Sequence, residues 1–379
     1  MSQALDEHRH YLADELRTSL YRKAIRDVVR PGDVVMDLGA GTGILGLLAC
    51  EAGARRIYAV DAGGMLQVAR ESARANGFGD RFVGIQGFST RIDLPEKVDV
   101  IVADQVGYFG FEAGLFESFR DATRRFLKPG GRTIPLSVTL QAAPVSCREG
   151  SDIVKFWSTH PGGFDFSSVS KIAANTVYPI TAKHLKPLSI TADLLTLDVV
   201  GAPSAFDAQA MTRVSRAGVI HGLGGWFRAR LSPSVTMTNN PVVSRRINRS
   251  CAFMPLDEPW RVAKGDRLQI AINVTPQQHL VTWKVRLFDR KGVEKLRATQ
   301  SSLRGMLMTA DAVARTNPRN APRLTPWGEA RRTVIEACDG RKSLAEIECL
   351  VFERHRKLFD SQAQAAEFVA KVTAADAAF

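Results

Sequence analysis

The sequence lacks the features that would place it in a membrane or send it across one. No run of roughly 18 apolar residues occurs in the chain, and a membrane-spanning helix needs about that length. The first ten residues, MSQALDEHRH, carry too many charges for the apolar part of a signal peptide. We therefore expect a protein that has no membrane partner and stays in the cytoplasm.

Cysteine is also scarce, and its spacing is uninformative. The five cysteines lie at positions 50, 147, 251, 338 and 349, with no C-x-x-C pair among them. Structural zinc sites rest on such closely spaced pairs, and stable disulfides belong to oxidising compartments. We expect reduced thiols in the core and no metal site.

Positive charge is what the sequence has in excess. Lys and Arg number 51 against 39 Asp and Glu, which gives a formal charge of +12. The two signs balance from Pro322 to Phe379, so the excess lies upstream, most of all between Arg213 and Arg267. This region is either a solvated basic face or a surface that attracts an acidic peptide or a nucleic acid. Because phosphate binding needs a basic footprint, the neutral C-terminal part argues against a nucleic-acid partner.

The first third of the chain alternates helices with apolar strands. Apolar residues at every fourth position from Leu12 to Val28 predict one amphipathic helix, which Pro31-Gly32 ends. The strands that follow are expected at 34–36, 57–60, near 83 and at 98–102, with helices at 44–52 and 65–76. Because helices connect successive strands in this rhythm, we expect an α/β fold over residues 1–136, with a parallel sheet covered by helices.

The pattern changes after Pro135. Short alternating stretches, punctuated by Gly and Pro, occur at 137–140, 194–199, 226–231, 268–274 and 281–288. They predict an antiparallel β-barrel or sandwich over residues 137–313. An exposed linker is expected at 314–324, followed by a small helical unit at 325–379.

A glycine-rich turn joins the first strand to the next helix. It reads Asp37-Leu38-Gly39-Ala40-Gly41-Thr42-Gly43. Glycines let the chain turn sharply and let a ligand approach the backbone beyond the strand ends. Asp61 ends the next strand, about 20 residues on, where a carboxylate can accept both hydroxyls of a ribose. The motif therefore predicts a ligand that contains a ribose at this edge of the sheet.

With these residues in place, the stretch from about residue 8 to residue 308 resembles the protein arginine methyltransferases. The segments that carry the resemblance are Asp14-Glu15-Leu16-Arg17-Thr18 with Tyr21-Arg22, Asp37 through Leu45, Gly107-Tyr108-Phe109 and Gly163-Phe164-Asp165-Phe166. They are similar to the helix before the sheet, the cofactor motif, the acidic hairpin and the start of the dimerisation arm. The resemblance implies S-adenosylmethionine as cofactor and a homodimer formed through a helical arm at about 163–186.

The same resemblance assigns the cofactor site. Arg17 would pair with the carboxylate of the cofactor's methionine moiety, and Asp61 would hold its ribose. The amino-acid end of the cofactor would be lined by Asp37, Gly39, Gly41 and Gly43. The adenine would be bordered by Ser89 and Thr90. The aromatic N-terminal helix that covers the cofactor in the family is expected to be largely missing here, which leaves His8 near the chain start.

The acidic hairpin departs from the family pattern. Asp104 stands where the family has its first glutamate, and the second would fall at Ala113, one residue after Glu112. We expect Asp104 to orient the acceptor and Glu112 to polarise it or receive its proton. Whether Glu112 or Glu117 replaces the second glutamate stays open, although helical periodicity places Glu117 on a solvated face.

These departures matter because an arginine acceptor needs two carboxylates that grip its guanidinium group. Asp104 is one methylene shorter than glutamate. The family's Thr-His-Trp loop is replaced by Arg246-Ile247-Asn248, and a basic Arg246 there would disfavour a cationic substrate. These departures count against arginine, but the resemblance still puts it first among the acceptors, with histidine or an amide behind it.

The C-terminal unit resembles a second family. The stretch from Thr333 to Ile347 is similar to the central part of PqqD-like domains, small winged-helix units that bind the leader segment of ribosomally made precursor peptides. Ser343 and Glu346 predict a capping box at the start of a helix. A generic helical or DNA-binding appendage is the alternative, and the neutral charge of this unit argues against DNA.

Together these features favour an S-adenosylmethionine-dependent N-methyltransferase that modifies a side chain of a precursor peptide recruited through its leader. Tethering raises the local concentration of the peptide, so a weakly specific site can suffice. One alternative is an arginine methyltransferase that acts on folded cellular proteins. Another is a catalytically silent scaffold in a peptide-maturation complex.

Overall fold

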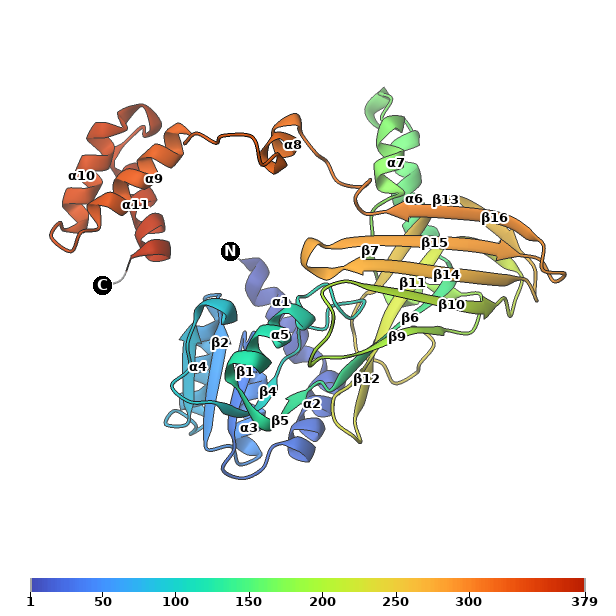
Figure 1. The fold of residues 1–379 in the computed structure, drawn as a ribbon, viewed down its shortest axis with the longest axis horizontal. Coiled ribbons are helices and arrows are strands. Elements are labelled where there is room, and N and C mark those ends of the chain that lie inside the picture. Colours follow the sequence, from blue (N-terminus) through green and yellow to red (C-terminus); the bar gives the residue numbers. More distant parts are fainter. Residues whose placement is uncertain (1, 378–379) are drawn as a thin grey trace. The chain divides into compact units, whose positions relative to one another are not determined.

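The computed structural model describes residues 2–377 and divides into two compact units, residues 1–306 and 307–379 (Figure 1). Each unit has a hydrophobic core of its own. The first unit contains an α/β part followed by two β-sheets, and the second is helical. The division falls shortly before the expected linker at 314–324.

The α/β part is built on a parallel sheet with the strand order β3-β2-β1-β4-β5. Its strands are β1 (Val34–Leu38), β2 (Arg56–Asp61), β3 (Phe82–Gln86), β4 (Val98–Val102) and β5 (Leu127–Ile134). Helices α2 (Glu15–Val28), α3 (Ile44–Glu51), α4 (Met65–Ala75) and α5 (Leu115–Phe126) pack on it. The expected parallel sheet is confirmed. Strand β5 was not expected, because Pro129-Gly130-Gly131 within it is typical of a turn.

The N-terminal segment forms two helices rather than one. Helix α1 (Ser2–Ala13) ends before Asp14, and the Asp14 carboxylate accepts the backbone N–H of Arg17 at 3.1 Å as the N-cap of α2. The apolar repeat that continues across this junction hid the break, since an Asp inside a periodic segment is also compatible with a helix. Helix α1 thus precedes α2, with Tyr11 as its one Phe, Tyr or Trp residue, and the expectation that the family's aromatic helix over the cofactor is largely missing stays a prediction.

Two antiparallel sheets follow and share a core with the α/β part. One has the order β10-β14-β15-β16, and the other has the order β7-β13-β11-β6-β8, with β9 paired to β6 and β12 to β11. The strands are β6 (Ser137–Ser146), β7 (Tyr178–Ile180), β8 (Lys186–Pro187), β9 (Ala192–Asp198), β10 (Phe206–Arg213), β11 (Gly218–Arg230), β12 (Thr236–Thr238), β13 (Cys251–Val262), β14 (Arg267–Thr275), β15 (Leu280–Phe288) and β16 (Glu294–Ser301). All five alternating stretches singled out in the sequence fall on these strands, and two of them, 194–199 and 226–231, extend one residue past the strand end.

A helical insertion interrupts the β strands, but it begins earlier than expected. It comprises α6 (Arg148–Lys155), the short 3₁₀ turns η2 (Phe156–Ser158), η3 (Pro161–Gly163) and η4 (Ser167–Val169), and α7 (Ser170–Ala173). The expected arm at about 163–186 therefore covers only its second half, and residues 178–187 beyond it form β7, η5 (Ala182–His184) and β8. In Figure 1, α6 and α7 project from the sheets.

The C-terminal unit consists of helices in the part of the chain that the structure describes. These are α8 (Ala310–Thr316), α9 (Pro326–Ala337), α10 (Leu344–Arg354), η7 (Arg356–Leu358) and α11 (Gln362–Asp376). The capping box between Ser343 and Glu346 is confirmed at the start of α10. No strand forms between residues 307 and 377, so the expected winged helix lacks its wing, and α9, α10 and α11 pack as a three-helix unit.

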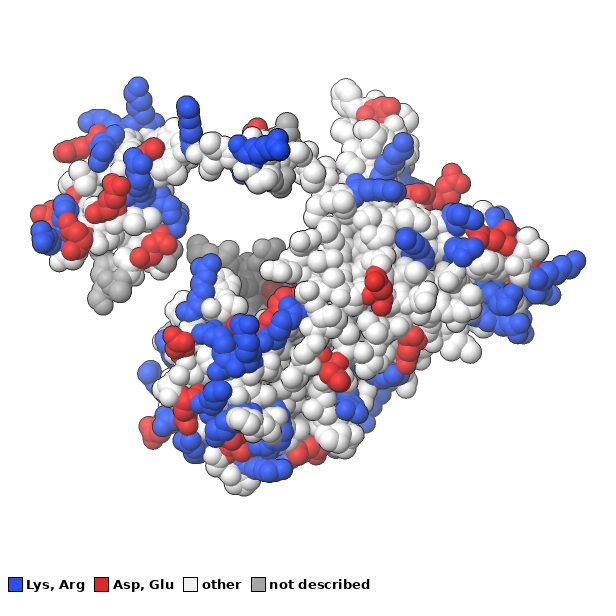
Figure 2. Space-filling model, in the orientation of Figure 1, with Lys and Arg blue, Asp and Glu red and all other residues white. Residues whose placement is uncertain are grey.

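Several expectations about composition can be compared with the fold. Cys50, Cys147 and Cys251 are buried free thiols, whereas Cys338 and Cys349 are exposed, so only three of the five lie in the core. None of the helices described has the length and apolar character needed to cross a membrane. On the face drawn in Figure 2, Lys and Arg side chains are interspersed with Asp and Glu and form no continuous basic stripe.

Candidate cofactor and acceptor site

The glycine turn stands at the carboxyl end of β1, as expected for a ligand-binding edge. Gly39, Gly41 and Gly43 all have positive φ angles, of 70°, 52° and 77°, which other residues rarely adopt. A Cβ atom on Gly39 would lie 2.5 Å from Nε2 of Gln105, and one on Gly41 would lie 2.5 Å from the ring of His8 on α1. The turn therefore requires glycine for its backbone conformation and for the close approach of neighbouring side chains.

Two carboxylates hold this turn. Asp61 accepts the backbone N–H of Gly41 at 2.8 Å and of Gly63 at 2.7 Å. Asp37 is fully buried, and one of its oxygens accepts the N–H of Gly46 at 2.8 Å. The other oxygen has no hydrogen-bond partner among the described residues, and burial raises the pKa of Asp37 to about 7. A buried, unpaired acceptor is costly unless a ligand donates to it.

Ser89 and Thr90 begin the 3₁₀ turn η1 (Ser89–Arg91), in the loop between β3 and β4. Arg125 of α5 donates to the Ser89 carbonyl oxygen at 2.7 Å and fixes this turn against α5. Both residues thus stand beyond the end of β3, the strand that pairs with β2 as far as Asp61. Their proposed contact with the adenine stays a prediction.

Arg17 is buried and pairs with Asp104. Its Nε donates to the Asp104 carboxylate, and its Nη1 donates to the Tyr11 carbonyl oxygen at 3.2 Å. The guanidinium carbon also lies 5.5 Å from the ring centres of both Tyr11 and Tyr21. The expected contact of Arg17 with the cofactor's carboxylate would have to coexist with this ion pair or replace it.

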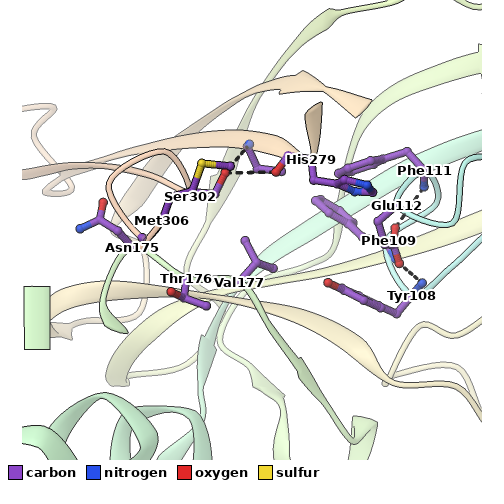
Figure 3. Close-up of a pocket in the computed structure, with 12 residues that line it drawn as sticks. Tyr108, Phe109, Phe111, Glu112, Asn175, Thr176, Val177, His279, Ser302 and Met306 are labelled. Carbon is purple, nitrogen blue, oxygen red and sulfur yellow. Dashed lines mark hydrogen bonds between the residues drawn. The ribbon is translucent and has the colours of Figure 1, made fainter. Parts of the chain in front are cut away.

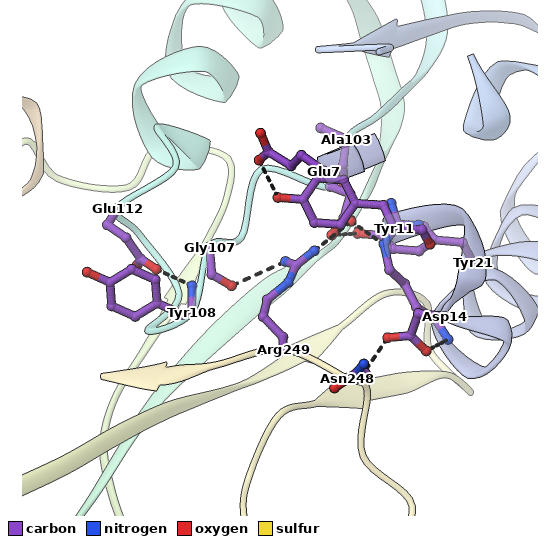
Figure 4. A network of polar contacts seen from close by, with 12 residues as sticks. Glu7, Tyr11, Asp14, Tyr21, Ala103, Gly107, Tyr108, Glu112, Asn248 and Arg249 are labelled. Atoms are coloured by element: carbon purple, nitrogen blue, oxygen red, sulfur yellow. Dashed lines mark hydrogen bonds and ion pairs between the residues drawn. The ribbon is translucent and has the colours of Figure 1, made fainter. Parts of the chain in front are cut away.

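Asp104 accepts hydrogen bonds from several residues of a polar network, of which Figure 4 labels Tyr21 and Arg249. Besides Arg17, its carboxylate accepts Nη2 of Arg249 at 3.1 Å and the Tyr21 hydroxyl at 3.0 Å. Burial by itself would raise the pKa of Asp104, but the Arg249 and Arg17 guanidinium groups hold it below its ordinary value. Asp104 is therefore ionised and already has three partners within the protein.

Glu112 is folded back onto its own turn (Figure 3). Its carboxylate accepts the backbone N–H groups of Tyr108, of Phe109 at 2.9 Å and of Phe111 at 3.2 Å. Burial raises the pKa of Glu112, while these N–H groups oppose that shift. The expected role of Glu112 in polarising the acceptor competes with this capping of the hairpin backbone.

The two expected catalytic carboxylates do not line the same cavity. Asp104 lines a cavity of about 440 Å³, together with Arg17, Tyr108, Arg249 and residues of α1. Glu112 lines a separate cavity of about 250 Å³, which His279 and Met306 also border. Tyr108 stands between the two and contributes to both.

Sequence reasoning missed two residues of this region, Glu117 and Arg249, and gave Arg246 a role that its contacts do not support. Glu117, expected on a solvated face, has both carboxylate oxygens buried with no hydrogen-bond partner among the described residues. Arg246, expected to repel a cationic substrate, instead donates to the Val243 carbonyl oxygen and does not line the Asp104 cavity. Arg249, three residues on, lines the cavity instead, together with Arg17. The Arg-Arg-Ile-Asn-Arg run signalled that an arginine was present but not which one points inward.

Comparisons with known proteins agree on methyl transfer. Residues 17–141 match the family model of ribosomal protein L11 methyltransferase (PrmA). The chain is 29% identical over 321 residues to the probable protein arginine N-methyltransferase 6 of Arabidopsis thaliana, an alignment that covers 78% of this chain and 72% of that protein. It is 36% identical over 189 residues to protein arginine N-methyltransferase 6 of Danio rerio, covering 47% of this chain and 54% of the relative.

Two solved structures share the fold. One is the Trypanosoma brucei PRMT1 enzyme–prozyme heterotetrameric complex with AdoHcy, with a TM-score of 0.69 and 22% identity over 78% of this chain and 96% of that one. The other is Arabidopsis thaliana protein arginine methyltransferase 10 in an open conformation, with a TM-score of 0.67 and 22% identity over 79% of this chain and 98% of that one.

The residues at the glycine turn fit S-adenosylmethionine. The unpaired buried oxygen of Asp37 can accept from the cofactor's ammonium group, and Asp61 stands at the end of β2, where a ribose binds in such folds. No group of three or more potential metal ligands occurs among the residues described. The chain is an S-adenosylmethionine-dependent methyltransferase whose sequence and fold are similar to those of the protein arginine methyltransferases.

Proposed function

We propose that this enzyme methylates a side-chain nitrogen of a peptide, and that the Asp104 cavity receives this side chain. The position of the cavity relative to the glycine turn carries the proposal. Gln105 follows Asp104 directly, and its side chain lies against Gly39 of the turn. The acceptor cavity thus adjoins the cofactor turn, as a transfer between the two requires.

The cavity suits one side chain of a larger molecule. It measures about 440 Å³, and exposed residues such as Glu7, His10 and Asn248 border it. When bound, S-adenosylmethionine supplies a methyl group on a positively charged sulfur. The acceptor must offer an uncharged nitrogen with a lone pair, and a carboxylate of this chain would take the proton that leaves.

The relatives' names support arginine as the acceptor, and histidine and amide nitrogens are the other candidates. The curated relatives are named arginine N-methyltransferases, and the segment around Asp104 resembles the acidic hairpin of that family. The buried, unpaired carboxylate of Glu117 is a second negative group in this part of the fold. Glu117 has no hydrogen-bond partner among the described residues, whereas Glu112 already caps three backbone N–H groups.

We propose further that the C-terminal unit recruits the peptide through its leader. A groove of about 630 Å³ lies between α9, α10 and α11. Ile335 and Leu344 line it with side chains that are 47% and 40% exposed, and Lys342 and Asp376 add charge of both signs. Since no strand edge is available in the described part of this unit, the leader would bind in the groove by apolar anchors rather than by adding a strand.

Co-expression with a candidate precursor peptide from a neighbouring short open reading frame tests the proposal. Mass spectrometry should show a peptide heavier by one or more methyl groups, with the modification on a nitrogen-bearing side chain after the leader. Methylation of a folded cellular protein with no leader dependence would favour the first alternative. Cofactor binding without methyl transfer to any peptide or protein would favour the scaffold.

A further inference from the structure

The Asp104 carboxylate already holds a guanidinium group that belongs to the protein itself. Nη2 of Arg249 donates to Asp104 at 3.1 Å, and Nη1 donates to the Gly107 carbonyl oxygen at 3.2 Å (Figure 4). The guanidinium carbon lies 5.4 Å from the ring centre of Tyr11. The side chain is only 12% exposed, so Arg249 is part of the cavity wall and not a surface arginine.

The backbone on both sides of Arg249 is tied down. The N–H of Asn248 donates to the Asp14 carboxylate at 2.7 Å, at the junction of α1 and α2. The carbonyl oxygen of Ser250 accepts from Nδ2 of the buried Asn239 at 2.7 Å, and the same amide donates to the Tyr108 carbonyl oxygen. The guanidinium group is therefore held at Asp104 by its anchors as well as by its charge.

The charges around Asp104 leave no place for a further cation. One of its oxygens accepts from Arg17 and Arg249, and the other accepts the Tyr21 hydroxyl. Two guanidinium groups thus face the single carboxylate of Asp104, so positive charge is in excess at this carboxylate itself. The other carboxylates of the lining, Glu7 and Asp14, already accept the Tyr11 hydroxyl and the N–H groups of Arg17 and Asn248, respectively. A third guanidinium entering here would be repelled and poorly paired.

We propose that Arg249 determines the acceptor: it bars an arginine side chain from Asp104 and makes the cavity select an uncharged nitrogen, such as that of an imidazole. The inference rests on the proposed methylation of a peptide side chain and narrows its acceptor class. A neutral imidazole needs no carboxylate pair to hold it and offers its lone pair without first losing a proton. Arginine, favoured by the relatives' names, is then disfavoured by this cavity.

A small probe tests the occupancy of Asp104 without any peptide. We measure the melting temperature of the full-length protein with S-adenosylhomocysteine while adding millimolar methylguanidinium. Arg249→Ala, which vacates the position, should be stabilised, whereas the wild type and the double variant Arg249→Ala/Asp104→Asn should not respond. Arg249→Gln serves as a second vacating variant should the alanine protein fold poorly. Equal responses of wild type and both single variants would overturn the proposal.

Acceptor choice is the second readout. Two synthetic peptides, identical except for a single Arg or a single His, are compared for methylation by the full-length enzyme. The wild type should prefer the His peptide, and Arg249→Gln should shift the ratio at least tenfold toward Arg, with Arg249→Lys staying near wild type. A wild type that methylates the Arg peptide as well as the His peptide contradicts the proposal. Methylguanidinium could stabilise only the Arg249 variants while neither peptide is methylated. That result would support the exclusion of guanidinium by Arg249 and would contradict the proposed methylation of a peptide.

Discussion

At the scale of single residues, Asp61 is the most direct test of the cofactor site. Replacing it with Ala removes a carboxylate at the end of β2 and its hydrogen bonds to the backbone N–H groups of Gly41, in the turn, and of Gly63. We expect the affinity for S-adenosylmethionine to fall by roughly 1.5–3 kcal/mol, the range for hydrogen bonds to charged groups. Titration calorimetry measures it, with the exposed Asp80→Ala as control. Unchanged affinity in Asp61→Ala would remove this residue from the site.

Asp37 predicts a pH dependence of the unliganded protein. Its pKa rises from 3.8 to about 7 on folding, so the folded state binds the proton more tightly than the unfolded state. This contribution to stability is fully present below pH 4 and is lost as the pH rises toward 7. Between pH 4 and 7 the stability of Asp37→Asn should therefore fall less than that of the wild type. Thermal unfolding across this range checks it, and parallel curves for both proteins would contradict it.

Glu117 is the residue at which the structure most clearly corrects the sequence interpretation. A buried carboxylate without a partner costs stability unless a ligand uses it. We expect Glu117→Gln to raise the melting temperature of the free protein while lowering turnover by roughly 10²-fold, as for loss of a general base. The exposed Glu258→Gln is the matched control. A variant that is no more stable and fully active would show that Glu117 is neither strained nor used.

At the scale of elements, the helical insertion between β6 and β7 carries the prediction of a homodimer. Phe156, Phe164 and Phe166 are 48%, 72% and 40% exposed, and the rings of Phe156 and Phe166 contact Trp157. The insertion that carries them projects from the sheets (Figure 1). Clustered aromatic exposure of this kind is typical of a contact surface. Sedimentation at micromolar concentration should give a dimer, and Phe164→Glu should give a monomer. A monomeric wild type would count against the insertion as a dimer contact.

The junction of α1 and α2 shows how an element boundary contributes to the site. Asp14 caps α2 with one carboxylate oxygen and holds the Asn248 backbone with the other. Because the chain breaks here, α1 can bring Tyr11 against Arg17 and Arg249, and His8 against Gly41. An unbroken helix from Leu12 to Val28, as the periodicity predicted, would give the chain no such turn.

At the scale of the whole molecule, the question is whether the C-terminal unit recruits the substrate. Deleting residues 325–379 should leave residues 1–306 folded, because residues 1–306 form a compact unit with a hydrophobic core of their own. Methylation of a leader-bearing peptide should then fall by roughly 10²-fold or more, since tethering is lost. The core peptide without its leader should react slowly and at the same rate with both proteins.

A point variant separates recruitment from gross truncation. Ile335→Glu places a charge in the groove between α9, α10 and α11 on a side chain that is already half-exposed, so folding should survive. It should reduce the rate with the leader-bearing peptide but not with the leaderless one, whereas Ala substitution of the exposed Arg323 should do neither. Equal rates for intact and truncated enzyme on the leader-bearing peptide would contradict recruitment by the C-terminal unit. They would leave the methyltransferase activity itself unaffected.

By itself the sequence determined the parallel sheet, the glycine turn with Asp37 and Asp61, the change to β strands after Pro135 and the helices of the C-terminal unit. These features depend on local periodicity and on residues close together in the chain. Only the tertiary structure decided that Asp104 and Glu112 line different cavities, that Glu117 is buried and that Arg249, not Arg246, enters the site. Those outcomes depend on contacts among residues 11–21, 104–117 and 239–250, which come together only when the α/β part packs against the β-sheets.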